Sequence, residues 1–159
     1  KGESSLMRLI LITAALTLLF YAGQECNAQA PACPDVISVA AAVSEDHLKN
    51  WNDLSRLFKK HRGCDDGALA EGYSDFVVRT LAHRWDTLEE LKKLAAEDKT
   101  FEDFVLKHID ASAEPDHIVM VLTNVKERCP ADSTQICPSI EKAARKTLQD
   151  LGALKKSNH

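Results

Sequence analysis

The sequence predicts an all-α fold, a compact irregular bundle of about six short helices stapled by two disulfide bonds. Apolar residues recur at helical spacing along almost the whole chain after Pro34. Gly, Pro and Asp residues divide this pattern into short segments, and no segment alternates as a half-buried strand would. An irregular array of α–α pairs is the alternative, since one pattern recurs 34 residues later: Trp51, Leu54 and Leu57 are matched by Trp85, Leu88 and Leu91.

The first elements follow Pro34. The apolar stretch from Val36 to Val43 suits a first helical turn behind that proline. Ser44 is then expected to cap a helix whose apolar stripe begins at Leu48 and which ends at Gly63.

Five further helices are predicted in chain order. Asp65 or Asp66 caps the next helix, and Gly72 inside it indicates the close approach of another helix or side chain, with Trp85 as the candidate neighbour. The remaining four begin at Asp86 or Thr87, at Thr100, after Pro115 and near Pro138.

The N-terminal end has the pattern of a secretory signal peptide. Arg8 precedes an apolar run over 9–22 and a polar stretch over 24–30 that ends in Ala-Gln-Ala. The run holds roughly 14 residues, fewer than the roughly 20 of a membrane-spanning helix. We therefore expect upstream residues over 1–6, a signal peptide over 7–30 and a single helical domain over 31–159. The protein is predicted to be exported to the periplasm or the cell exterior, with no membrane attachment after cleavage.

Cysteine usage agrees with export. Cleavage removes Cys26 and leaves an even number of cysteines, which is typical of disulfide bonding in exported chains. Of the three pairings, we predict Cys129–Cys137, which closes a short loop, and Cys33–Cys64, which ties the mature N-terminus to a turn. No C-x-x-C motif occurs, so neither a metal nor another cofactor is predicted.

Charged and aromatic residues supply candidate partner-binding positions. The formal net charge of −4 argues against nucleic acid, which normally needs a basic surface. Asp65, Asp66 and Glu71 form the densest acidic cluster, either a helix cap or a surface that faces a partner. Arg84 and Trp85 are residue types that anchor interfaces, although Trp85 equally suits the core.

No catalytic residue is predicted. Ser74 lies in a helix, whereas a serine nucleophile on an elbow needs a preceding strand. His108 with Asp110, and His117 with Asp116, are the remaining titratable pairs, and a general base would need a second group converging from elsewhere.

One stretch resembles a known group of proteins. Residues 64–74, with the sequence Cys-Asp-Asp-Gly-Ala-Leu-Ala-Glu-Gly-Tyr-Ser, resemble a group of small exported bacterial helical proteins that has no assigned activity. Trp85, residues 104–110 and residues 128–130 fit the same group, so the resemblance covers roughly 48–137. It implies export and a helical fold, and it implies no reaction.

These observations favour a non-enzymatic exported module that binds an unknown protein partner in the cell envelope. Immunity proteins and inhibitors of secreted enzymes offer a fold-level analogy. The alternatives are a small hydrolase that uses His108 or His117 with a nearby carboxylate, and a carrier of a small ligand in an apolar cavity.

Overall fold

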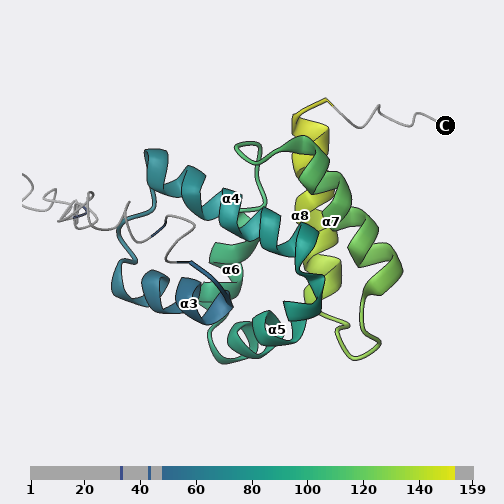
Figure 1. Cartoon of the computed structure of the whole chain (residues 1–159), viewed down its shortest axis with the longest axis horizontal. Helices are drawn as coiled ribbons and strands as arrows, with labels where there is room; N and C mark the ends of the chain where they lie inside the picture. The colour runs from purple at the N-terminus through teal and green to yellow at the C-terminus, as the bar shows by residue number, and fades with distance from the viewer. Residues whose placement is uncertain (1–32, 34–42, 44–47, 153–159) are drawn as a thin grey trace, which may run out of the picture. The chain divides into compact units, whose positions relative to one another are not determined.

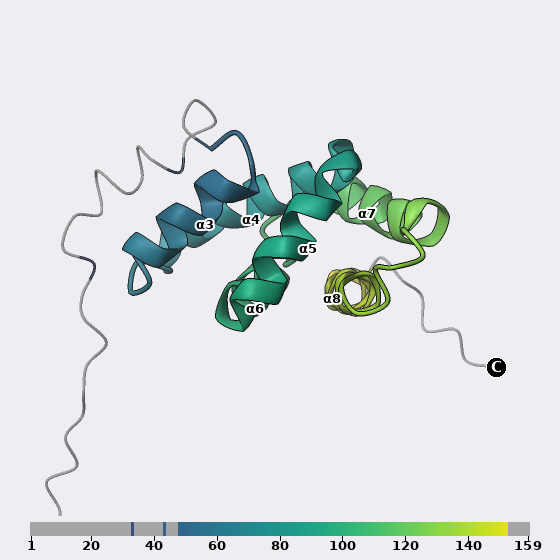
Figure 2. The ribbon, with the colours of Figure 1, turned by 90° about the horizontal axis from the view of Figure 1, so that it is seen from below.

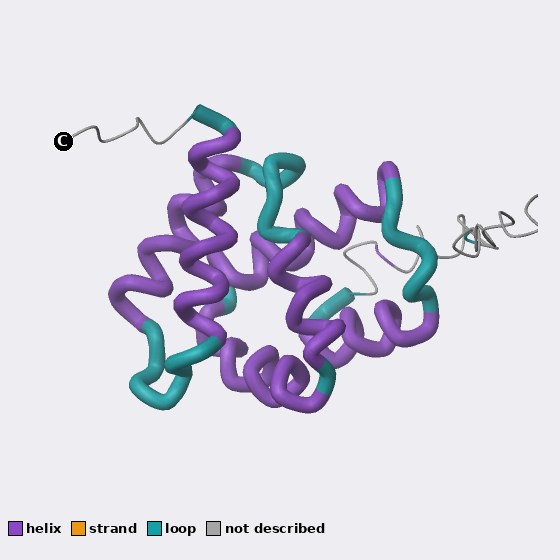
Figure 3. Tube along the Cα trace, turned by 180° about the vertical axis from the view of Figure 1, so that it is seen from behind, coloured by secondary structure: helices purple, strands orange, loops and turns teal. Residues whose placement is uncertain are grey.

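Six α-helices and one 3₁₀ turn make up the ordered elements of a computed structural model that describes Cys33, Val43 and residues 48–152 (Figure 1). Over these residues the structure contains no strand, and the all-α prediction is confirmed (Figure 3). The predicted signal peptide lies outside the described residues, as do residues 36–42 of the helical turn predicted over 36–43; Val43, its last residue, is helical. The elements are α3 (Trp51–Lys60), α4 (Gly67–His83), η1 (Trp85–Thr87), α5 (Leu88–Glu97), α6 (Lys99–Lys107), α7 (Pro115–Arg128) and α8 (Ile136–Asp150).

Helix packing joins segments that are distant in the sequence. α7 packs against both α4 and α8, and α5 packs against α3 and α6. A further contact between α6 and α8 connects these two groups of helices. Figure 2 shows α8 nearly end-on, with α7 beside it.

The first described helix begins later than predicted. Leu48, Lys49 and Asn50 are not helical, and Asn50 has an extended backbone (φ −154°, ψ 173°). Its side chain accepts a hydrogen bond of 2.9 Å from the backbone N–H of Asp53, so Asn50 is the N-cap of α3. The prediction that this helix follows a cap at Ser44 is therefore wrong, and the helix also ends at Lys60 rather than at Gly63.

The other helix starts fall close to the predicted positions. Asp66, one of the two predicted caps of α4, accepts a hydrogen bond of 2.8 Å from the N–H of Gly67. α6 begins one residue before Thr100, because Asp98 accepts from the N–H groups of Thr100 and Phe101. α7 begins at Pro115 and α8 at Ile136, in each case just before the predicted start.

Both tryptophans are core residues that hold separate segments together. Trp51 is fully buried and Trp85 is 4% exposed. The indole N–H of Trp51 donates to Thr87 Oγ1 at 3.0 Å, and that of Trp85 donates to the carbonyl of Arg128 at 3.0 Å. Each ring is thus packed among apolar side chains and has its polar atom satisfied. The two segments that share the apolar pattern 34 residues apart contact each other, because α3 packs on α5.

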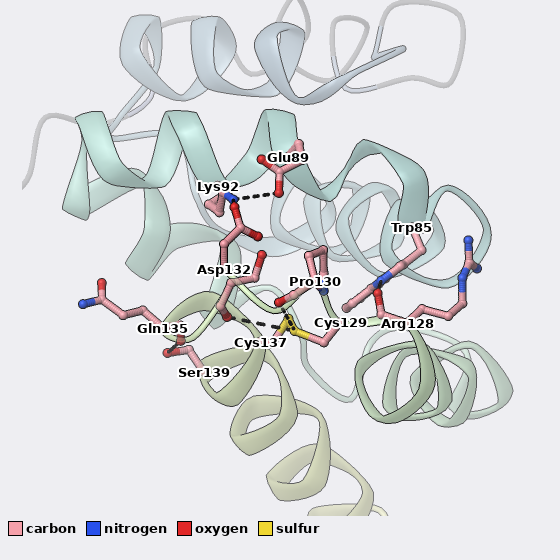
Figure 4. The surroundings of a disulfide bond; sticks show 11 residues. Trp85, Glu89, Lys92, Arg128, Cys129, Pro130, Asp132, Gln135, Cys137 and Ser139 are labelled. Carbon is pink, nitrogen blue, oxygen red and sulfur yellow. Dashed lines mark hydrogen bonds and ion pairs between the residues drawn. A yellow bond between two sulfur atoms is a disulfide. The ribbon is translucent and has the colours of Figure 1, made fainter.

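Both predicted disulfide bonds are present. Cys33 is bonded to Cys64, with Cα atoms 4.8 Å apart, and Cys129 is bonded to Cys137, with Cα atoms 6.4 Å apart. Figure 4 shows the second bond between the end of α7 and the start of α8, with the contact of Trp85 and Arg128 nearby. On the chain-entropy account, loops of these lengths stabilise the fold by about 3.7 and about 2.6 kcal/mol respectively.

The prediction that another side chain approaches Gly72 closely is confirmed. A Cβ atom built on Gly72 would lie 2.5 Å from Cγ1 of Val43, a side chain in the core. The neighbour is therefore Val43, and the prediction that named Trp85 is wrong. Trp85 is instead directed toward the start of the 129–137 loop.

Gly72→Ala is expected to destabilise the protein by about 1–3 kcal/mol, because the added methyl group overlaps the β-branched side chain of Val43. In a Val43→Ala background the same substitution should become stabilising, by up to about 1 kcal/mol, since only the helix propensity of alanine then remains. Urea unfolding of the four proteins measures both steps. An equal effect of Gly72→Ala in the two backgrounds would contradict the contact.

Candidate functional site

Four polar side chains meet where α4 approaches the C-terminal end of α6. Ser74 lies in α4, His108 is the C-cap of α6, Asp65 precedes α4 and Asp110 follows α6. We call these four residues the His108 cluster. Ser74 Oγ is 2.9 Å from His108 Nδ1 and 2.9 Å from Asp110 Oδ2. His108 Nε2 is 3.1 Å from Asp65 Oδ1, close enough for an ion pair, but the two atoms form no hydrogen bond.

Local structure directs each group to this place. Asp66 caps α4, which leaves Asp65 to turn toward α6. His108 is the C-cap of α6, and its backbone N–H donates to the carbonyl oxygens of Phe104 and Val105, each at 3.2 Å. Asp110 accepts from the N–H of Ser112 at 2.9 Å, and this short turn holds its carboxylate beside α4.

Aromatic rings surround the imidazole. The ring centroid of His108 is 4.4 Å from that of Phe104 and 5.4 Å from that of Tyr73. Phe104 in turn contacts Phe58 of α3, at 4.7 Å between ring centroids. The His108 cluster therefore lies against an aromatic part of the core, where the imidazole Nδ1 and the Ser74 hydroxyl are each other's hydrogen-bond partners.

Burial and charge shift the pKa values of three groups. Burial lowers the pKa of the His108 imidazole, although the negative charges of Asp65 and Asp110 oppose this effect. Burial alone would raise the pKa of Asp110, but hydrogen bonds from Ser112 and Ser74 outweigh it and lower that pKa. Burial and the negative charge of Asp65 raise the pKa of Tyr73 to about 12. At neutral pH His108 is therefore neutral, Asp110 is ionised and Tyr73 is protonated.

The distances within the cluster are those of a serine hydrolase, but access to it is closed. A nucleophilic serine needs a base within hydrogen-bond reach, and His108 meets that condition for Ser74. Ser74 is fully buried and His108 is 1% exposed. Asp65 covers Nε2, and its other carboxylate oxygen pairs with Lys107 Nζ at 2.6 Å. A substrate could reach Ser74 only after this cover opened.

The predicted partner-binding residues fall in different environments. Asp66 and Glu71 are exposed, whereas Asp65 is turned inward to Lys107 and His108. Arg84 is exposed, and its guanidinium donates to the carbonyl of Lys49. Trp85 is a core residue in the structure, so it presents no ring face to a partner, and this corrects the interpretation of Trp85 as an interface anchor.

His117 is placed differently from His108. Its ring meets that of His83 edge-on, with centroids 4.7 Å apart, where the end of α4 approaches the start of α7. Among the described side chains, no carboxylate is hydrogen-bonded to His117. A general base supported by an acid is therefore not assembled here.

Surface hollows lie away from the His108 cluster. One of about 140 Å³ lies between α5, α6 and the start of α8, and charged side chains such as Lys92 and Asp132 line it. Another, of about 480 Å³, runs along α8 among exposed polar side chains such as Arg145. Neither is the apolar interior cavity that a carrier of a small ligand requires.

Sequence reasoning named His108 and Asp110 as a pair but did not connect them to Ser74 or Asp65. Ser74 and His108 are 34 positions apart and lie on different helices. The available signal was helical spacing: Ser74 comes three and four residues before Val77 and Val78, which places it on the apolar side of α4. A serine at such a position needs a polar partner from another segment.

Ser74→Ala is expected to destabilise the protein by about 1–3 kcal/mol, because it leaves buried polar atoms of His108 and Asp110 without their shared partner. Ser139→Ala is the matched control, since Ser139 makes the same bond to the carbonyl four residues earlier, but on an exposed face. That control should change the free energy of unfolding by less than about 0.5 kcal/mol. Equal effects in thermal or urea unfolding would argue against the network.

The described residues contain no candidate for a metal-binding group of three or more ligands or for a membrane-spanning helix. Within the described ranges, no group of three or more His, Cys, Asp or Glu side chains is arranged to hold a metal ion. None of the helices in that part of the chain combines the length and apolar character needed to cross a membrane.

Comparison with known proteins found no relative. The chain matches no known protein family, no curated protein and no solved structure.

Proposed function

We propose that this chain is an exported, disulfide-bonded module that binds a protein partner in the bacterial periplasm or outside the cell. The observation that carries the proposal is the pair of disulfide bonds, Cys33–Cys64 and Cys129–Cys137. Such bonds persist in oxidising compartments and are rare in the cytosol. The signal-peptide pattern at the N-terminus and the resemblance of residues 64–74 to small exported bacterial proteins agree with this location.

The positions of the polar groups favour binding of a protein partner over catalysis on a small molecule or transport of one. Ser74 and His108, which have the spacing needed for catalysis, are enclosed. The surface hollows are open to solvent and have charged side chains in their walls, which does not suit a ligand carrier that encloses its ligand. A helical module of this kind is analogous to immunity proteins and to inhibitors of secreted enzymes.

The proposed contact surface is the N-terminal part of α4. Asp66 and Glu71 are exposed there, and no ion pair with another described residue engages either carboxylate. The neighbouring disulfide bond between Cys33 and Cys64 holds the start of α4 in place. A rigid acidic surface favours a partner with a basic surface, mainly through faster association and correct orientation.

The test uses the full chain with its leader, expressed in a bacterium and cross-linked in the envelope. We expect recovery of one specific protein, and an affinity roughly tenfold lower for Asp66→Asn/Glu71→Gln, a loss of about 1.4 kcal/mol. Glu114→Gln/Asp116→Asn is the control, since it makes the same charge change at exposed positions near the start of α7. Recovery of no specific protein, or equal weakening by both double variants, would contradict the proposal.

A hydrolase is the second candidate, because Ser74, His108 and two carboxylates converge at hydrogen-bonding distances. It requires the contact of Asp65 with Lys107 to open so that an acyl or phosphoryl group can reach Ser74 Oγ.

Labelling with a fluorophosphonate probe separates the two candidates. The binding-module proposal predicts that the folded chain is not labelled, because the probe cannot reach a fully buried hydroxyl. Labelling that Ser74→Ala and His108→Gln abolish, while Ser139→Ala leaves it intact, would replace the proposal with a hydrolase. Mass spectrometry of the tryptic peptide containing Ser74 identifies the modified residue.

A further inference from the structure

Two histidine side chains meet where the end of α4 approaches the start of α7. His83 is the last residue of α4 and is exposed, and His117 lies in the first turn of α7 and is half-buried. Their ring centroids are 4.7 Å apart, and the angle between the ring planes is 87°. We call these two residues the histidine pair.

The ring nitrogens of the histidine pair are not used within the described structure. Among the described residues, no hydrogen bond or ion pair engages a ring nitrogen of His83 or His117. His108 differs, because it is buried and its Nδ1 is bonded to Ser74. Each neutral ring of the histidine pair therefore has a nitrogen lone pair that is available to an external ligand.

The separation of the two rings matches a shared metal ion. A metal–imidazole bond is about 2.0–2.1 Å long and a ring nitrogen lies about 1.1 Å from the ring centre, so each centre lies roughly 3.2 Å from a bound ion. Two such rings have centres roughly 4.5 Å apart at a right angle and roughly 5.2 Å apart at the tetrahedral angle. The observed 4.7 Å is closer to the right angle. Because His83 is exposed, rotation about its side-chain torsions can direct a nitrogen to the ion without movement of the backbone.

Helix packing fixes the backbone that carries the histidine pair. The side-chain amide of Asn124 in α7 donates to the carbonyls of Leu81 at 3.0 Å and Ala82 at 2.8 Å, directly before His83. These bonds are buried, so separation of α4 from α7 would leave polar groups without partners. The two imidazoles are therefore held close together before a metal ion arrives, which lowers the entropic cost of binding.

The charges near the histidine pair suit a cation. His83 ends α4, and the last turn of a helix carries partial negative charge. The start of α7 carries partial positive charge, but the exposed carboxylates of Glu114 and Asp116 counter it there. Arg79, one turn before His83, is paired with Asp75, which offsets its positive charge.

We propose that His83 and His117 form a binding site for a divalent transition-metal ion, and that copper(II) is the ion bound most tightly. Imidazole nitrogen is a good ligand for copper, nickel and zinc, and copper(II) has the highest affinity in this series. A near-right angle between the ligands also suits the tetragonal geometry of copper(II) better than the tetrahedral geometry of zinc. Two protein ligands leave the remaining positions to water, so the ion is exchangeable.

The metal site is separate from the proposed contact surface for a protein partner. Asp66 and His83 lie at opposite ends of α4, roughly 25 Å apart along a helix of this length. Loss of metal binding and loss of partner binding are therefore distinguishable by substitutions at the two ends.

Titration of the full-length, disulfide-bonded chain with copper(II) chloride at about pH 7.5 tests the site, since protons compete little with the metal there. The readout is NMR of the histidine rings, because a paramagnetic ion broadens the signals of nearby groups. At less than one equivalent we expect the signals of His83 and His117 to broaden together and before that of His61. Broadening of only one of the two, or of His61 first, would overturn the proposal.

His83→Gln and His117→Gln distinguish one shared ion from two independent ions. Each single variant should weaken copper binding at this site by at least about tenfold, since loss of an outer-shell partner alone costs 10- to 100-fold in metal affinity. His61→Gln is the matched control, because His61 also lies at a helix end, that of α3, and it should change the affinity by less than about twofold. Tight binding retained by either single variant, or equal weakening in His61→Gln, would contradict a shared ion.

Thermal unfolding gives a second measurement that does not depend on NMR signals. Copper(II) in excess should raise the melting temperature of the wild-type chain, because an ion that binds only the folded state stabilises it. The same addition should have little effect on His83→Gln, whose exposed substitution is not expected to disturb folding. Copper(II) should also bind at least about tenfold more tightly than zinc(II). Equal melting shifts in both chains, or tighter binding of zinc, would overturn the assignment.

Discussion

The burial of Ser74 and His108 at the junction of α4 and α6 is the constraint on which the surrounding structure depends. Both side chains have lost contact with water, so their polar atoms must be satisfied by each other and by nearby carboxylates. Those carboxylates come from the residue before the α4 cap and from the loop after α6. The positions of α4, of α6, of the residue before the α4 cap and of the loop after α6 are therefore linked. A shift of any one of them would leave a buried polar group without a partner.

Polar groups also connect the rest of the core. The indole N–H of Trp85 reaches the end of α7, and that of Trp51 reaches Thr87 at the start of α5. The amide of Asn124 in α7 donates to the carbonyls of Leu81 and Ala82, near the end of α4. These bonds satisfy groups that helix ends and large aromatic rings would otherwise bury unpaired, and they also specify which helices are neighbours.

The starts and ends of helices show how far local sequence could predict the fold. The capping of α4 by Asp65 or Asp66 and the start of α7 near Pro115 were predictable, because a capping carboxylate and a proline at the first position act within one turn. The start of α3 was not, since Ser44 and Asn50 are both good caps, and the choice of Asn50 accompanies packing of Trp51 against Phe76 of α4 and its hydrogen bond to Thr87 of η1. The neighbour of Gly72 was also not predictable, because Val43 is distant in the sequence.

The sequence by itself determined the helical class, an even number of cysteines after the expected cleavage and an N-terminal pattern typical of export, whereas which of the three cysteine pairings forms is seen only in the folded chain. These properties depend on short-range spacing, on composition and on the order of residues, which a single chain displays directly. Only the tertiary structure decided that Trp85 is a core residue, that Asp65 turns inward while Asp66 stays exposed, and that Ser74 meets His108. Each of these depends on which helix faces which, and the apolar stripes alone do not specify that choice, since many pairings bury them equally well.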